Sequence, residues 1–334
     1  MAPHTAQVWR IYSRRDPGAQ IHVAARGPRG GTPLLLVHGF FQPASAILDV
    51  PGWSLQQALA DRGLRVVLFD LRGYGRSTRP AFMAQPPGDS QPALGCLADA
   101  VADIGDVVEH LCQDEDCEQV DLLGYSWGTA RSCAYALQSP RRVRRIVLIA
   151  PVWRPATGAA AEATDPRQPG QMDPRLGGYR ILGPGDLARQ WDNETGDAPI
   201  ASFRDAQVLA AAEAALLASD SELQGRGYRA PLGPMCDALA VAQGRPLFDA
   251  ARLQGPMLLV RGDHDLLSSA ADAQALFDAL GSSQRSLITV AQGTHLLHLE
   301  HVREALIEST SAFLGASAGS AARALSATQR RQAS

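Results

Sequence analysis

Six short apolar runs set the limits on how this chain of 334 residues can fold. They are residues 33–39, 65–71, 119–126, 145–151, 256–262 and 285–290. Their nearly continuous apolar character is typical of parallel strands that are buried on both faces of a sheet. Two alternating segments, 8–13 and 21–27, precede them, and the Asp-Pro-Gly signal between these two predicts an antiparallel hairpin. We therefore expect eight strands in one mostly parallel sheet.

Helical patterns separate most of these runs. Residues 93–112 carry apolar side chains at steps of three and four, which predicts an amphipathic helix covering the sheet. A second helix is expected from Ser126 to just before Pro140, which cannot continue it, and a last one over 302–314. Alternating strands and helices indicate an α/β fold with right-handed crossovers.

The alternation stops between Trp153 and about Arg252. This segment begins with a stretch rich in Pro, Gly and Ala and continues with helical patterns such as residues 200–220, without a run typical of a strand. We expect residues 153–252 to be a helical cap inserted in a core of residues 1–152 and 253–315, above the carboxyl ends of the strands. Residues 316–334 hold few large apolar side chains and are expected to be disordered.

Composition excludes several classes of partner. The net charge is −3, and no cluster of Lys and Arg alternates with aromatic residues, which argues against nucleic acid. No segment is apolar over the length of a membrane span, and the first residues lack the apolar stretch of a signal peptide. The five cysteines show no pairing pattern. We expect a cytoplasmic monomer or homodimer that acts on a small molecule.

A serine at the end of one apolar run is the first candidate for chemistry. The spacing Gly124-x-Ser126-x-Gly128 suits a sharp turn from strand to helix that exposes one hydroxyl. A serine becomes a nucleophile only beside a base that a third group orients. Because parallel strands end at one edge of the sheet, the acids of "GDHD" after residue 262 and the histidine of "GTHLLHLE" are expected close to Ser126.

Five motifs together resemble the α/β-hydrolase fold superfamily. They are "VHGF" at 37–40, "DLRGYGRS" at 70–77, "GYSWG" at 124–128, "GDHD" at 262–265 and "GTHLLHLE" at 293–300. The resemblance extends from about Val8 to Leu314 and implies a serine esterase-like member with a helical cap.

The resemblance also implies a role for each motif residue. Ser126 corresponds to the nucleophile and His295 to the general base. The family spacing Gly-x-x-Asp from Gly262 assigns the acid to Asp265, whereas Asp263 is expected to serve the turn.

An oxyanion hole is expected from two backbone N–H groups beside Ser126. The residue after the nucleophile, Trp127, supplies one, and Phe40 in the "VHGF" turn supplies the other. The side chains of Phe41 and Trp127 are expected to line the acyl site. No cofactor is implied. No metal is expected either, because the spacing of His295, His298 and His301 does not predict convergent ligands.

The resemblance also narrows the set of reactions that the chain is expected to catalyse. Members that dehalogenate or open epoxides carry an aspartate at position 126, the "HGGPG" turn of proline iminopeptidases is absent, and Leu296 replaces the tryptophan of many C–C bond hydrolases. Hydrolysis of a moderately hydrophobic carboxylic ester or thioester is the favoured hypothesis. The alternatives are a C–C bond hydrolase, a non-hydrolytic enzyme such as a lyase or cofactor-free peroxidase, and a binding protein that retains the three residues.

Overall fold

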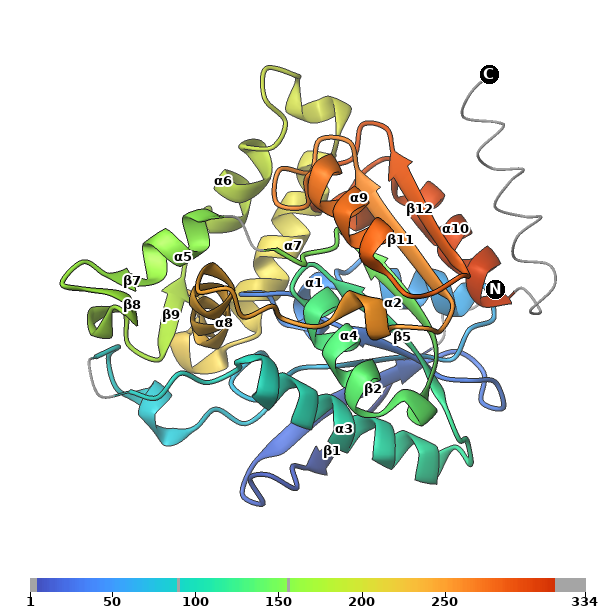
Figure 1. Cartoon of the computed structure of the whole chain (residues 1–334), viewed down its shortest axis with the longest axis horizontal. Helices are drawn as coiled ribbons and strands as arrows, with labels where there is room; N and C mark the ends of the chain where they lie inside the picture. The colour runs from blue at the N-terminus through green and yellow to red at the C-terminus, as the bar shows by residue number, and fades with distance from the viewer. Residues whose placement is uncertain (1–4, 89–90, 155–156, 316–334) are drawn as a thin grey trace.

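The computed structural model describes residues 5–88, 91–154 and 157–315 (Figure 1). Its centre is one eight-stranded sheet in the order β1-β2-β4-β3-β5-β6-β11-β12. Strand β2 is antiparallel to β1 and β4, and the other neighbours are parallel. The strands are β1 Gln7–Tyr12, β2 Gln20–Arg26, β3 Leu34–Val37, β4 Val66–Phe69, β5 Val120–Tyr125, β6 Val143–Ile149, β11 Met257–Gly262 and β12 Arg285–Val290. The predicted eight-stranded, mostly parallel sheet is confirmed.

Alternating residues of the central strands face opposite sides of the sheet, and both sides are covered. In β3, Leu34 and Leu36 belong to one buried apolar cluster, whereas Leu35 and Val37 belong to another. A strand buried on both faces needs apolar side chains at every position, which is why the sequence shows runs and not alternation.

Helices α2 and α10 lie on one face of the sheet, and α3 and α4 lie together on the other. The core helices are α1 Ala44–Ile47, α2 Leu55–Asp61, α3 Leu97–Asp114, α4 Gly128–Gln138, α9 Ala270–Ala279 and α10 Arg303–Gly315. Helix α3 begins four residues later than predicted, because Gly95 has φ +77° and Cys96 is extended. The N–H of Leu97 then donates to the Asp237 carboxylate from the cap, which stabilises the start of the helix.

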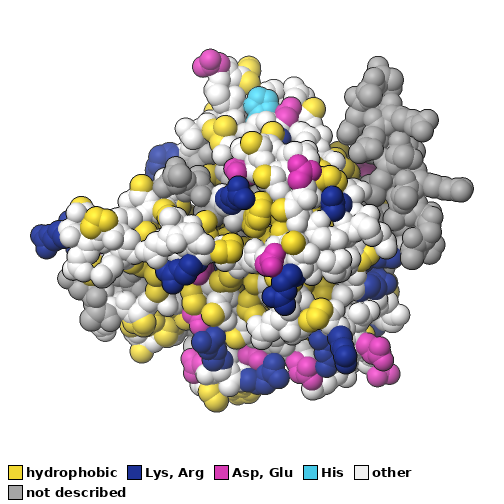
Figure 2. All heavy atoms as spheres, in the orientation of Figure 1, with side chains coloured by type: hydrophobic (Ala, Val, Ile, Leu, Met, Phe, Trp, Pro, Cys, Tyr) yellow, Lys and Arg dark blue, Asp and Glu magenta, His cyan; other side chains and the backbone are white. Residues whose placement is uncertain are grey.

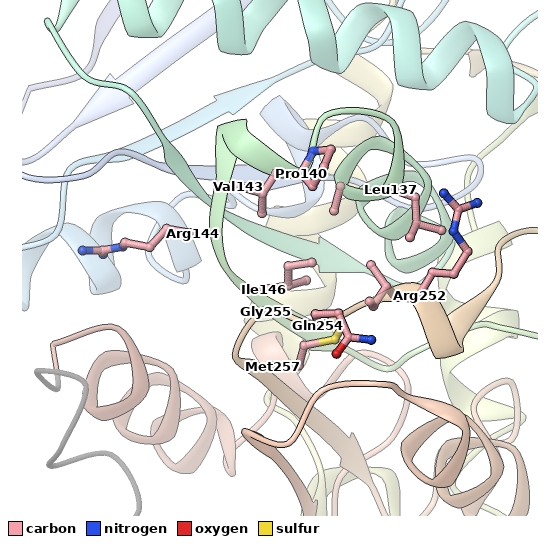
Figure 3. A pocket seen from close by; sticks show the side chains of 11 residues that line it. Leu137, Pro140, Val143, Arg144, Ile146, Arg252, Gln254, Gly255 and Met257 are labelled. Atoms are coloured by element: carbon pink, nitrogen blue, oxygen red, sulfur yellow. The ribbon is translucent and has the colours of Figure 1, made fainter.

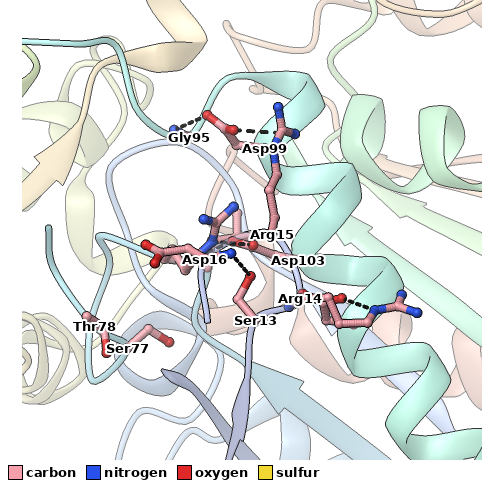
Figure 4. Close-up of polar contacts among 12 residues, drawn as sticks. Ser13, Arg14, Arg15, Asp16, Ser77, Thr78, Gly95, Asp99 and Asp103 are labelled. Carbon is pink, nitrogen blue, oxygen red and sulfur yellow. Dashed lines mark hydrogen bonds and ion pairs between the residues drawn. The ribbon is translucent and has the colours of Figure 1, made fainter. Parts of the chain in front are cut away.

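Ion pairs attach the first hairpin and the loop after β4 to α3 (Figure 4). The pairs are Arg14–Asp106, Arg15–Asp99 and Arg72–Asp103, with N···O distances of 2.6, 3.6 and 2.6 Å. Only the third pair is buried on both sides, so it contributes most to fixing the loop, while the exposed arginines contribute little.

We use the word cap for the described residues of 153–252, which lie between β6 and β11 and mix helices with short strands. Its elements are α5 Thr157–Ala163, β7 Thr164–Asp165, β8 Gln168–Met172, β9 Tyr179–Leu182, α6 Asp186–Asp192, α7 Ala206–Ala218, β10 Tyr228–Pro231 and α8 Gly233–Ala242. The prediction of a cap without strands is wrong, because β7 pairs with β8 and β9 with β10. These strands have two to five residues, too few for a periodic signal, and β9 and β10 lie far apart in the sequence.

Short 3-10 turns join several elements. They are η1 Ala81–Ala84, η2 Pro140–Arg142, η3 Pro174–Leu176, η4 Ile200–Ser202, η5 Ser221–Leu223, η6 Ala250–Arg252 and η7 Leu297–Leu299.

The cap contacts loops at the carboxyl ends of the strands. Gln42, after β3, donates to Gln190 of α6 at 3.3 Å, and the buried Arg229 of β10 donates to the Met83 carbonyl at 2.7 Å. In Figure 1, α5, α6 and the strand pair β7–β8 extend to one side of the sheet.

On the face shown in Figure 2, acidic and basic side chains are interspersed and do not form one large patch of a single sign. Within the described residues, no helix combines the length and the apolar character that crossing a membrane requires. The predicted disordered tail, 316–334, lies outside the described residues.

Candidate active site

Ser126 occupies a strained turn between β5 and α4. Its φ is +55°, in the left-handed region that non-glycine residues rarely adopt. The flanking glycines have no space for a side chain: a Cβ on Gly124 would lie 2.5 Å from the Gly128 carbonyl oxygen, and one on Gly128 would lie 2.9 Å from that of His38. The close approach of these backbones explains the Gly-x-Ser-x-Gly spacing.

Three side chains from separate loops form one hydrogen-bonded chain. The Ser126 hydroxyl lies 2.8 Å from Nε2 of His295, and Nδ1 of the same ring lies 2.9 and 3.0 Å from the two oxygens of Asp265. Ser126 follows β5, Asp265 follows β11 and His295 follows β12. His295 and Asp265 are almost completely buried, whereas Ser126 is partly exposed. The sheet therefore brings together the three residues that the motifs singled out.

Asp265, and not Asp263, lies against the histidine. One oxygen of Asp265 also accepts the backbone N–H groups of Leu267 and Ser268, at 3.0 and 2.7 Å, which fixes the carboxylate. Asp263 is substantially exposed and accepts the N–H of Gly293 at 3.2 Å. Its contact joins the two loops.

The surroundings of His295 favour its protonated form. Burial by itself would lower the pKa of this ring. The charge and hydrogen bond of Asp265, together with the nearby carboxylates of Glu194 and Glu300, outweigh that effect, so the pKa of His295 is raised above its ordinary value of 6.5. A ring with a raised pKa is a stronger proton acceptor than a free imidazole.

The loop after β3 lies directly beside Ser126. A Cβ on Gly39 would lie only 2.9 Å from Cβ of Ser126 and 3.2 Å from its Oγ. Within the described part of the chain, the N–H groups of Phe40 and Trp127 donate no hydrogen bond to protein. Both expected oxyanion donors are thus in the vicinity of Ser126 and unpaired.

Two buried residues below the loop fix its peptide groups. Nη1 of Arg131 in α4 donates to the carbonyls of His38 and Gly39, at 2.9 and 2.8 Å. Because the C=O and N–H of a trans peptide point in opposite directions, this contact turns the N–H of Phe40 away from Arg131.

The ring of His38 is neutral and adds a second contact. Its Nε2 accepts the N–H of Leu71 at 3.1 Å, so Nδ1 carries the proton and donates to the Gly39 carbonyl at 2.9 Å. Burial, with the Arg131 charge, lowers the pKa of His38 to about 3.

Aromatic side chains lie next to this loop. The rings of Phe40 and Phe41 are stacked with centroids 3.7 Å apart, and Trp127 lies 6.1 Å from Phe40. Phe40 and Phe41 also contact an apolar cap cluster that includes Met235, while Trp127 is buried. The two phenylalanines therefore connect the loop beside Ser126 to the underside of the cap.

A family model described as "alpha/beta hydrolase fold" matches residues 32–302, which is most of the chain. The chain belongs to the α/β-hydrolase fold family. Solved structures of similar architecture include a serine hydrolase involved in carbazole degradation (TM-score 0.62, 16% identity, covering 93% of this chain and 99% of that one) and an esterase from Thermogutta terrifontis (TM-score 0.58, 20% identity, 92% and 98%). At such identities these likenesses show the α/β-hydrolase fold alone.

Curated relatives match shorter segments. Epoxide hydrolase 4 of Mus musculus is 30% identical over 40% of this chain and 32% of its own length. A proline iminopeptidase of Heyndrickxia coagulans is 33% identical over 37% and 38%, and a 2-hydroxymuconate semialdehyde hydrolase of Pseudomonas sp. strain CF600 is 32% identical over 36% and 36%. The chain spans about a third of the length of these relatives, and their named reactions differ from one another.

Three residues that sequence reasoning missed surround the site of this α/β-hydrolase. Arg131 contacts the loop after β3, and Glu194 and Glu300 lie beside the loop that carries His295. Glu300 stands inside the "GTHLLHLE" motif, which offered a signal. Arg131 and Glu194 had none, because a buried guanidinium and a loop carboxylate of the cap look like ordinary surface residues in a sequence.

The histidines near the triad do not gather into a metal site. Nε2 of His298 contacts the carbonyl of Ile47 in α1, and Nε2 of His301 contacts the carbonyl of Ala201 in η4, each at 3.2 Å. Among the described residues, no group of three or more His, Cys, Asp or Glu side chains has the arrangement of metal ligands.

A separate hollow of about 290 Å³ lies at the other edge of the sheet (Figure 3). It is lined by Leu137 at the end of α4, by Pro140 just after it, and by Val143 and Met257, which begin β6 and β11. Because Ser126 follows the carboxyl end of β5, this hollow and the triad lie at opposite edges. Ligands of open α/β sheets bind at the carboxyl edge, so the triad edge is the candidate active site.

Proposed function

We propose that this α/β-hydrolase is a serine enzyme that cleaves carboxylic esters or thioesters through an acyl-enzyme on Ser126. The observation that carries the proposal is the continuous hydrogen-bonded chain from Ser126 through His295 to Asp265, at the carboxyl edge of the sheet. A hydroxyl, an imidazole and a buried carboxylate in this order form the arrangement that activates serine in acyl transfer.

The first half of the reaction forms the acyl-enzyme. The Ser126 Oγ attacks the carbonyl carbon while its proton passes to Nε2 of His295, and Asp265 holds Nδ1–H and stabilises the imidazolium. The N–H groups of Phe40 and Trp127 donate to the oxyanion. When the tetrahedral intermediate collapses, the bond to the alcohol or thiol breaks and His295 returns the proton to that leaving group.

The second half releases the acid. The neutral His295 takes a proton from water, whose oxygen attacks the acyl carbon, and the imidazolium then returns the proton to Ser126 Oγ as the ester bond to the enzyme breaks. The same two N–H groups donate to the second oxyanion. One water is consumed, and the enzyme ends in its starting protonation state.

Serine at position 126 favours esters over the epoxides of one named relative. Attack of Ser126 on an epoxide carbon would leave an alkyl ether, which lacks a carbonyl for water to attack, so the enzyme would not turn over. The aromatic side chains of Phe40, Phe41 and Trp127 beside the nucleophile support an acyl group of moderate hydrophobicity.

A panel of p-nitrophenyl esters with lengthening acyl chains, together with matched thioesters, tests the proposal. Wild type is expected to hydrolyse short to medium chains, and Ser126→Ala is expected to lose the activity while keeping the circular dichroism spectrum of wild type. Including a C–C bond substrate of the meta-cleavage type in the panel separates that alternative. Ester hydrolysis undiminished in Ser126→Ala would refute the proposal.

A further inference from the structure

The cap supplies a buried carboxylate directly to the histidine loop. Glu194 follows α6, and its Oε2 accepts the backbone N–H of His295 at 2.7 Å. The residue is 5% exposed. Its other oxygen, Oε1, is buried and has no hydrogen-bond partner among the described residues. A carboxylate that is desolvated for a single hydrogen bond is costly for stability alone, since a neutral acceptor would serve as well.

The same segment of the cap holds the histidine loop at a second point. Nε1 of Trp191, the buried aromatic residue of α6, donates to Oε1 of Glu300 at 2.7 Å. Glu300 in turn accepts the N–H and the hydroxyl of Thr294, the residue before His295. Two residues of the cap, Trp191 and Glu194, therefore hold the loop that carries His295 at two separate points.

This inference rests on the proposed function. We propose that Glu194 is a positioning residue for the triad of Ser126, His295 and Asp265: it fixes the backbone of His295 from the cap and adds a negative charge beside the imidazole. The hydrogen bond sets where the ring stands relative to Ser126. The charge stabilises the imidazolium that forms when Ser126 attacks, in addition to Asp265.

The charged and titratable groups around Glu194 come from several elements. His295 and Asp265 lie in the loops after β12 and β11, Glu300 follows η7, and Tyr125 ends β5. Burial, partly offset by His295, raises the pKa of Glu194 to about 7. Glu194 and His295 therefore interact, and each ionised partner favours the charged form of the other.

The rate at which a fluorophosphonate probe labels Ser126 tests this role without an identified substrate. The rate would be measured from about pH 5 to about pH 9 in wild type, Glu194→Gln and Glu194→Ala. Asp197→Asn serves as the matched control, because it removes one carboxylate from the same segment at an exposed position. Thermal unfolding of each variant is recorded in parallel.

The labelling rate is expected to fall at low pH, where His295 becomes protonated, and we call this part of the profile the acid limb. In Glu194→Gln the acid limb should move to lower pH by about one unit, because His295 loses a neighbouring negative charge. Glu194→Ala is expected to show the same movement and a plateau lower by about ten- to a hundredfold, because the hydrogen bond that positions the loop is also lost. Asp197→Asn should retain the wild-type limb and plateau.

The outcomes separate the role of Glu194 from the function itself. An acid limb that stays at the wild-type position in Glu194→Gln overturns the proposal, even where stability falls, because a structural role alone moves stability and not the limb. If Glu194→Ala does not fold, Glu194→Gln decides alone. Folded wild type that is not labelled at any pH overturns the serine mechanism and this inference with it.

Discussion

Replacing glycine by alanine is expected to have opposite effects on stability at two helical positions, Gly128 beside the turn at Ser126 and Gly105 in α3. Gly128, the first residue of α4, lies against the backbone of β3 and His38. A Cβ there would overlap the carbonyl oxygen of Val37 and would lie 2.9 Å from the Val37 carbonyl carbon and from the His38 carbonyl oxygen. The two 2.9 Å contacts alone require the start of α4 and β3 to separate by 0.5 Å to reach an ordinary contact of 3.4 Å, and the closer contact with the Val37 carbonyl oxygen requires more. Both are backbone segments of a packed core and cannot rotate away.

Gly105, in the middle of α3, has room for a methyl group. The nearest atoms to a Cβ are Cε2 of Tyr135 at 3.6 Å and Nη2 of Arg14 at 3.9 Å. Alanine in a helix interior is favoured over glycine by about 0.5–1 kcal/mol, so Gly105→Ala should raise the free energy of unfolding. Gly128→Ala should lower it by about 2 kcal/mol or more, because overpacking against backbone exceeds any gain in propensity.

Urea titrations followed by tryptophan fluorescence measure the two midpoints under one condition. The expected result is a higher midpoint than wild type for Gly105→Ala and a lower one for Gly128→Ala. Because the shift at Gly128 also displaces the loop after β3 from Ser126, labelling by a fluorophosphonate should slow in that variant only. Equal midpoints, or a more stable Gly128→Ala, would refute the reasoning about the tight strand-to-helix turn.

Three further predictions concern the site itself. Arg131→Met should lower kcat by about a hundredfold, with a smaller change in KM, because the peptide that carries the Phe40 N–H loses two anchors; an unchanged kcat would contradict this. Asp265→Asn should lower kcat/KM by about 10³- to 10⁴-fold, whereas Asp263→Asn should have little effect, and the reverse order would reassign the acid. The pH profile of kcat/KM should rise with pH through an apparent pKa above 6.5, because the neutral ring of His295 is the base and its pKa is raised; a flat profile would argue against that base.

The core of the fold could be predicted because its buried strands appear in the sequence as short apolar runs. All eight predicted strands are present, and most positions of the buried ones are apolar, with Asp121 in β5 and Arg261 in β11 among the exceptions. The turn at Ser126 could also be predicted, because only glycine fits at positions 124 and 128. Burial and close backbone contacts restrict which residue types fit, so these features can be recognised in the sequence.

The cap could not be predicted to the same depth. The pairing of β9 with β10 joins Tyr179 to Pro231 across more than half of the insertion, and four-residue strands leave no period to detect. Contacts of the cap with the site depend on single side chains such as Glu194, whose partner His295 is distant in the chain. Long-range pairs of this kind become visible only when the fold brings them together.

Peptide mapping by mass spectrometry after reaction with a fluorophosphonate tests the central claim most directly. The account predicts one adduct per folded chain, on the peptide that contains Ser126, with none in Ser126→Ala and a strongly reduced rate in His295→Ala. Folded wild-type protein that carries no adduct, or carries it on another residue, would contradict the account.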